Sequence, residues 1–135
     1  MRTIFVSSYN VDKPPASSLI AALRNSGVVV ENSPSNPADK SDPKWKKWYD
    51  EGLMATLMNC DTFVAVITDV WDSTWMVSEC QTALNLHNVS MMKKYYYWNP
   101  QRISVTAAGL VPYLKSELPM EMDKAVDILI QSNTA

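Results

Sequence analysis

Residues 60–86 change from the pattern of a buried strand to the pattern of an amphipathic helix, and this change sets the fold class. Residues 62–68 form a short run of β-branched and apolar side chains, of a length that suits a strand buried on both faces. A polar turn follows at 69–74, with Asp72 or Ser73 as the expected N-cap of the helix. The apolar face of that helix comprises Met76, Cys80, Ala83, Leu84 and His87. A strand, a turn and a helix in this order predict an α/β fold.

The rest of the chain repeats this alternation. Strands are expected at 3–7, 28–30, 62–68 and 95–98, and helices at 16–26, 44–59, 73–87 and 118–130. A strand, a helix and a strand at this spacing favour a right-handed parallel crossover. Residues 111–114 are expected to add a short edge strand, where Pro112 is tolerated. The chain therefore predicts one domain, residues 1–135, with a flavodoxin-like three-layer fold: a central parallel sheet of about five strands in the order 2-1-3-4-5, with helices on both faces.

Composition excludes several classes of function. The net charge is −2 and charged residues make up 19% of the chain, so no nucleic-acid partner is expected, although Lys93 and Lys94 precede an aromatic run. The chain has neither a 20-residue apolar span nor a signal sequence, which predicts a cytoplasmic protein with no membrane partner. Cys60 and Cys80 are expected to be reduced and buried, and no metal site is expected.

The expected topology also predicts the position of a site. In a doubly wound sheet, ligands bind beyond the carboxyl ends of the strands where the strand order reverses, here between the first and third strands. This crevice would gather Ser7, Ser8, Tyr9, Asp69, Trp71, Trp75 and Glu79. Glu79 follows Trp75 by four positions, so the two side chains share one side of the helix. Hydroxyls, an aromatic ring and a carboxylate suit a ribose joined to a flat heterocycle. A solvent-facing Glu79 beside a core Trp75 is the alternative.

The turn also carries a family resemblance. Residues 73–79, after a hydrophobic strand that ends in Ile67 and Thr68, resemble the Ser-x-Trp-x-x-x-Glu segment of TIR (Toll/interleukin-1 receptor) domains. Residues 4–9 are similar to the opening strand and Ser-Tyr loop of that family, and residues 53–66 to its helix leading into a strand. The chain departs from the family in having two adjacent serines in the first loop. The loop at 31–43 also lacks the Arg-Asp…Pro-Gly pattern of many members.

The resemblance implies a bacterial stand-alone enzyme that cleaves NAD, either an NAD glycohydrolase or an ADP-ribose cyclase, in immune signalling such as antiphage defence. It implies that Glu79 acts at the nicotinamide ribose and that Trp75 packs on the base. NAD would be the substrate, with no further cofactor. The expected partners are a second copy of the chain or an effector reached through a nucleotide product.

Two other functions remain open. A nucleoside 2-deoxyribosyltransferase shares the fold type and uses a Glu after the same strand, but its turn usually carries small residues, unlike the Trp-Asp-Ser-Thr-Trp turn at 71–75. A non-catalytic TIR-like interaction module would bind a partner and leave NAD intact.

For NAD, the bond to nicotinamide breaks through an oxocarbenium-like ribose, which a carboxylate can stabilise or attack.

Overall fold

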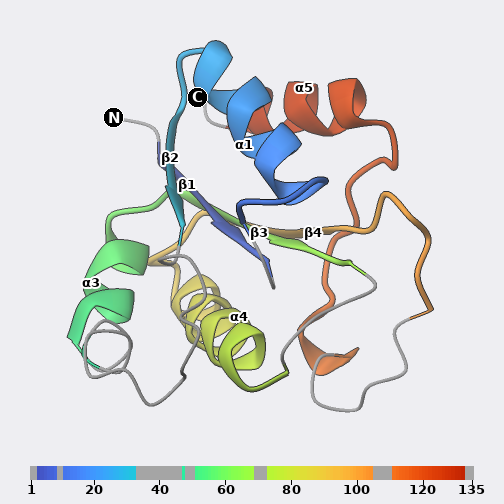
Figure 1. Ribbon diagram of the computed structural model, residues 1–135. Helices are drawn as coiled ribbons and strands as arrows, with labels where there is room; N and C mark the ends of the chain where they lie inside the picture. The colour runs from blue at the N-terminus through green and yellow to red at the C-terminus, as the bar shows by residue number, and fades with distance from the viewer. Residues whose placement is uncertain are drawn as a thin grey trace.

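A parallel four-stranded sheet forms the centre of the structure, a computed structural model that describes residues 3–8, 11–32, 47, 51–68, 73–104 and 111–132; the side chains of residues 73–75, 111 and 132 are not described. The strands are β1 (Thr3–Ser7), β2 (Val29–Asn32), β3 (Thr62–Val66) and β4 (Lys94–Trp98), in the order β2-β1-β3-β4 (Figure 1). The strand order reverses beside β1, because β1 pairs with β2 on one side and with β3 on the other. The predicted α/β class and the first four positions of the predicted order are confirmed.

Helices cover both faces of the sheet, as the sequence predicts. On one face lie α1 (Ala16–Asn25) and α5 (Met122–Ser132), and on the other lie α3 (Leu53–Met58) and α4 (Ser73–Asn88) (Figure 1). The predicted helix at 44–59 lies partly outside the described residues, and α3 is its described end. Within the described part of the chain, no helix has the length and apolar character needed to cross a membrane.

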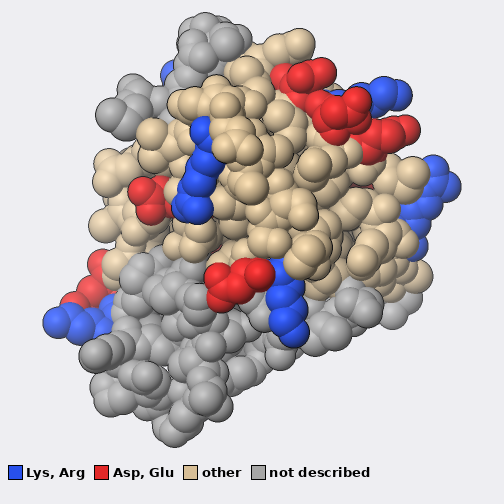
Figure 2. Space-filling model, turned by 45° about the horizontal axis from the view of Figure 1, so that its top comes forward, with Lys and Arg blue, Asp and Glu red and all other residues tan. Residues whose placement is uncertain are grey.

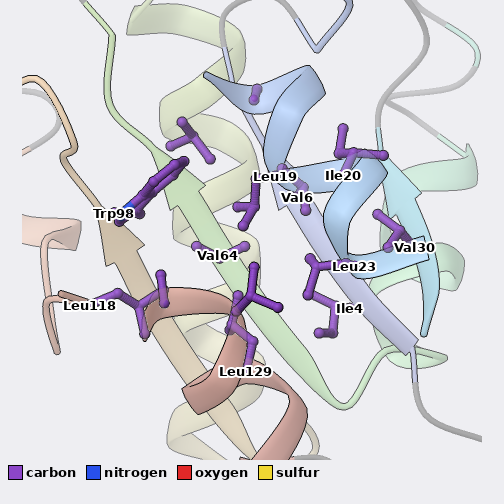
Figure 3. Close-up of a cluster of buried hydrophobic side chains, with 14 of the residues drawn as sticks. Ile4, Val6, Leu19, Ile20, Leu23, Val30, Val64, Trp98, Leu118 and Leu129 are labelled. Carbon is purple, nitrogen blue, oxygen red and sulfur yellow. The ribbon is translucent and has the colours of Figure 1, made fainter. Parts of the chain in front are cut away.

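The core between the sheet and the α1–α5 layer is aliphatic. Ile4 and Val64 point from the strands towards Leu23 of α1 and Leu129 of α5, and these four side chains are fully buried (Figure 3). Burying one such side chain stabilises the fold by roughly 1.5–3 kcal/mol. Trp98 closes this cluster at β4, where its indole N–H donates to the carbonyl of Met120 at 3.1 Å.

The opposite core, under α3 and α4, contains an aromatic ladder that crosses the sheet. Phe5, Phe63 and Tyr95 occupy equivalent positions on β1, β3 and β4, as the strand register shows. Their rings are stacked, with centroids 5.8 Å apart for the first pair and 5.1 Å for the second. Such cross-strand aromatic pairs fix the register, because a slip of one residue would turn every side chain to the other face.

The predicted edge strand at 111–114 is wrong, and the described sheet has four strands where about five were expected. Val111–Tyr113 forms a short 3-10 helix, η2, and Pro112 has no N–H to give to a strand ladder. The chain meets the edge of β4 a few residues later. There Tyr97 forms an isolated parallel bridge with Glu117, and the N–H of Leu118 donates to the carbonyl of Tyr97 at 2.8 Å.

Candidate functional site

A polar row lies next to the aromatic ladder, towards the carboxyl ends of the strands. Ser7 of β1 pairs with Ala65 of β3, and Ala65 pairs with Tyr97 of β4. These residues lie two positions beyond Phe5, Phe63 and Tyr95, so they share the α4 face of the sheet. Ser7 and Tyr97 therefore add hydroxyl groups on either side of Ala65, at the end of the sheet where the α/β architecture places its ligand crevice.

Glu79 of α4 is joined to this row. The Ser7 hydroxyl donates to Oε2 of Glu79 at 3.2 Å, and the two side chains are 0% and 1% exposed, respectively. The contact joins residues that are 72 positions apart in the sequence. It places the carboxyl group at the end of β1, on the side where β1 pairs with β3.

The start of α4 explains why Glu79 is buried. The helix begins at Ser73, shortly after β3 ends, so its first turns lie over the sheet. Met76, Cys80 and Ala83 are 2%, 0% and 0% exposed and face the sheet at helical spacing. Glu79 belongs to this buried set. Among the described Asp, Glu, Lys and Arg residues it is the only one that is buried.

The surroundings of Glu79 are of low polarity. Burial raises the pKa of the neighbouring Cys80 thiol, and the charge of Glu79 raises it further. Both cysteines are free and buried, as predicted. Charge–charge and charge–dipole interactions are strong where water is excluded, so a carboxylate here would act strongly on a positive charge brought next to it.

Ser8 contributes a second buried hydroxyl to this end of β1. The residue is 7% exposed, and its Oγ has no hydrogen-bond partner among the described residues. Leaving a buried hydroxyl without a partner costs roughly 1–3 kcal/mol, so this group is available to a ligand or a water molecule. Of the two adjacent serines, it is Ser7 that contacts Glu79.

Of the seven predicted site residues, the structure brings together Ser7 and Glu79, with Ser8 adjacent along the chain. Tyr9, Asp69 and Trp71 lie outside the described residues. Trp75 lies in the first turn of α4, but its side chain is not described, so its contact with a base stays a prediction.

Tyr97 belongs to the polar row but is not among the predicted site residues. Its hydroxyl donates to Oε2 of Glu117 at 2.7 Å, and this hydrogen bond is the main reason that the pKa of Tyr97 is raised to about 12. The alternation of residues 95–98 could have placed Tyr97 on the Ser7 face, had the register between strands been known. No group of three or more His, Cys, Asp or Glu side chains among the described residues is arranged to hold a metal ion.

On the face shown in Figure 2, acidic side chains gather at one corner with basic side chains beside them, and much of the remaining described surface is uncharged. The candidate site is defined by the buried pair of Ser7 and Glu79 and by the position of this pair on the sheet.

Comparison with solved structures supports the fold. The chain is similar to the TIR domains in the structure of the activated Roq1 resistosome that directly recognises the pathogen effector XopQ, with a TM-score of 0.57 and 15% sequence identity. The similarity covers 100% of this chain and 72% of that chain. Neither the protein-family models nor the curated proteins that were searched contain a match. At this level of identity the likeness shows a TIR-like fold.

Proposed function

We propose that the chain is a TIR-like enzyme that cleaves NAD at the bond between nicotinamide and ribose, with Glu79 as its catalytic residue. The observation that carries the proposal is the buried contact between Ser7 and Glu79 at the carboxyl end of β1. The topology independently predicts a ligand crevice there, because the strand order reverses beside β1. The TIR-like fold adds support, since the resemblance assigns catalysis to this Glu.

The chemistry follows from the charge that develops on the ribose. As the C1′–N bond breaks, nicotinamide leaves with the bonding electrons and C1′ becomes oxocarbenium-like. Glu79 would stabilise this cation or attack it, and water or a group of the same nucleotide would then complete the bond at C1′. The Ser7 hydroxyl would act as a positioning group, because its hydrogen bond fixes the orientation of the carboxyl group. Trp75 is proposed to stack on the leaving base, and Ser8, Tyr9, Asp69 and Trp71 to line the ribose pocket.

Access is the main constraint on this mechanism. Glu79 is 1% exposed, so the described arrangement shields the carboxyl group from a molecule as large as NAD. Turnover would therefore require an opening of the site, driven by self-association or by a partner. An enzyme that is closed at rest suits immune signalling in the bacterial cytoplasm, where the nucleotide product would report infection to an effector.

The test is mass spectrometry of NAD incubated with the full chain over a wide range of protein concentrations. We expect release of nicotinamide together with linear or cyclic ADP-ribose. Glu79→Gln should abolish the release, and the matched variant Glu31→Gln, which changes an exposed carboxyl on the edge strand β2, should retain it. Circular dichroism would verify that both variants fold. Equal nicotinamide release by wild type and Glu79→Gln would remove Glu79 from the mechanism.

The burial of Glu79 also favours a second candidate, a non-catalytic interaction module in which the carboxyl group is structural. This candidate expects intact NAD at every protein concentration and saturable binding to another TIR surface. A parallel incubation with a deoxynucleoside and a free base covers the deoxyribosyltransferase alternative, which expects exchange of the base.

A further inference from the structure

A groove of about 710 Å³ lies beside the carboxyl end of β4, so it is at the same end of the strands as the Ser7–Glu79 pair. Asn99 and Arg102 line it from the segment after β4, Glu117, Pro119 and Glu121 line it from the segment before α5, and Ile128 lines it from α5, on the face of the sheet opposite α4. The carbonyl of Trp98 at the end of β4 accepts from the N–H of Ile67 at the end of β3 at 2.8 Å, so the two carboxyl ends are adjacent. This groove is separate from the Ser7–Glu79 pair, and the proposed cleavage step does not use it.

The backbone beside this groove is strained in two places. Arg102 and Ser116 adopt the left-handed conformation, with φ values of 52° and 56°. Bulky residues rarely adopt this conformation, and such strain concentrates at ligand sites. Asn99 holds the first strained turn closed: its amide donates to the carbonyl of Ile103 at 2.8 Å and accepts from the N–H of Ile103 at 2.9 Å.

Arg102 lies within this closed turn, and its side chain is exposed. The Nε of Arg102 lies 3.1 Å from Sδ of Met120 on the opposite wall, so the guanidinium reaches across the groove. On the second wall, Glu117 is held by the Tyr97 hydroxyl at 2.7 Å. The groove thus combines one positioned guanidinium, two carboxyl groups and apolar surface from Ile103 and Pro119.

These groups match the parts of a nucleotide. A guanidinium binds phosphate oxygens through paired N–H groups. A carboxylate accepts hydrogen bonds from the hydroxyls of a ribose, as it does in dinucleotide-binding folds. The apolar wall suits a flat base. A ligand that was only anionic would be repelled by Glu117, whereas a nucleotide offers hydroxyls to it; Glu121 is ion-paired with Lys124 at 3.9 Å.

One row of residues across the sheet connects Glu79 with the wall of the groove. Ser7 and Tyr97 lie two strands apart in one row, which at the usual strand spacing is about 10 Å. Glu79 contacts one end of this row, and Glu117 at the wall of the groove contacts the other. A diphosphate that links two riboses spans a comparable distance.

We propose that this groove binds the adenylate half of NAD, with Arg102 as the ligand of the diphosphate; the identity of the substrate rests on the function proposed above. The groove then holds the part of NAD that does not react, and its binding energy places the nicotinamide ribose at Glu79. Arg102 is therefore a specificity residue that favours the dinucleotide over nicotinamide mononucleotide.

The first test measures binding without chemistry, by calorimetric titration of the full chain with ADP. We expect Arg102→Ala to weaken ADP binding at least ~10-fold, because it removes the paired phosphate contacts. Arg102→Gly is a second variant that relieves the backbone strain, and it should weaken binding equally while remaining folded. Lys94→Ala is the matched control: it removes an exposed cation at the other end of β4 and should bind ADP as the wild type does. Equal dissociation constants in wild type and both Arg102 variants, or no saturable ADP binding, would overturn the proposal.

The second test compares substrates. We expect the ratio of kcat/KM for NAD to kcat/KM for nicotinamide mononucleotide to fall towards one in Arg102→Ala, mainly through a higher KM for NAD. If NAD is cleaved and this ratio does not change, the groove proposal fails while Glu79 keeps its role. If NAD is never cleaved but ADP binds in an Arg102-dependent way, the proposed function fails and the groove stands as a nucleotide site.

Discussion

The contact between Ser7 and Glu79 makes a prediction about stability that needs no substrate. Ser7→Ala removes the hydroxyl that donates to Oε2 of Glu79 at 3.2 Å and changes little else, since the side chain is 0% exposed and loses a single oxygen. Removing the donor leaves a buried carboxyl oxygen without this hydrogen bond, which costs roughly 1–3 kcal/mol. We therefore expect Ser7→Ala to lower the free energy of unfolding by about 2 kcal/mol, which for 135 residues corresponds to about 7 °C in Tm.

A double-mutant cycle isolates this contact from other effects of removing the hydroxyl. In a Glu79→Leu background the hydroxyl has lost this acceptor, so Ser7→Ala should cost less than ~0.5 kcal/mol there. Glu79→Leu alone is expected to be neutral or stabilising, because a well-packed apolar side chain in place of a buried carboxyl group avoids the cost of desolvating that group. Ser8→Ala is the matched control, since Oγ of Ser8 has no hydrogen-bond partner among the described residues.

Urea unfolding followed by circular dichroism measures all of these variants under one set of conditions. The expected order of stability places Ser7→Ala clearly below both Ser8→Ala and the wild type. If Ser7→Ala costs the same in the wild-type and Glu79→Leu backgrounds, within about 0.5 kcal/mol, the two side chains are not coupled. The site would then lose the interaction that positions its carboxyl group.

Three further predictions follow from buried or paired polar groups. Thr62 is 0% exposed, and its hydroxyl has no hydrogen-bond partner within the described ranges. Thr62→Val should therefore raise the free energy of unfolding by about 1 kcal/mol in the same urea assay. A loss of stability would reveal a partner for that hydroxyl. The Tyr97 hydroxyl donates a hydrogen bond to Glu117, so its pKa should be about 12 in the folded protein, and Glu117→Gln should lower this pKa towards 10; absorbance at 295 nm follows the titration. The folded state then keeps a proton that the unfolded state loses near pH 10, so stability should fall between about pH 10 and 12. Burial raises the pKa of Cys60 to about 12 and raises that of Cys80 as well, so Ellman's reagent at neutral pH should detect no fast-reacting thiol in the folded protein and two after unfolding.

The fold could be predicted from the sequence to the extent that periodicity controls it. The strand at 3–7 has the expected bounds, and the helix expected at 16–26 begins at Ala16 and ends one residue early, at Asn25. Gly27, two residues after the helix ends, adopts a φ of 84°, as a glycine that stops a helix commonly does. Besides the missing N–H of Pro112, the prediction of an edge strand at 111–114 failed for a non-local reason. The Tyr95 hydroxyl donates to the carbonyl of Tyr113 at 2.7 Å, a contact that holds this segment in its place and that no local pattern reveals.

The candidate site could be predicted less completely. Topology brought the end of β1 to the start of α4, and this was enough to suggest that Ser7 and Glu79 belong together. Whether Glu79 faces solvent or the sheet depends on where α4 begins, since two residues more or less at its start would rotate the side chain by about 200° around the helix axis. The sequence does not predict the groove beside Arg102, because its lining comes from residues 99–103, residues 117–121 and Ile128, and the first two segments meet through a side-chain contact between Arg102 and Met120.

Stability alone gives a poor account of Glu79. Its neighbours on the buried face of α4 are Met76, Cys80 and Ala83, and an apolar side chain at position 79 would complete that face. A carboxyl group in the same place has to be desolvated, a cost that an apolar side chain avoids and that polar contacts such as the hydrogen bond from Ser7 offset. Ser7 in turn places a polar group at a fully buried position of β1. Ser7 and Glu79 are two polar residues of an otherwise apolar core, and they meet across 72 residues at the end of the sheet where the proposed site lies. The proposed chemistry would explain why both positions are polar. A Glu79→Leu variant that is as stable as the wild type but inactive towards NAD would separate the two roles directly.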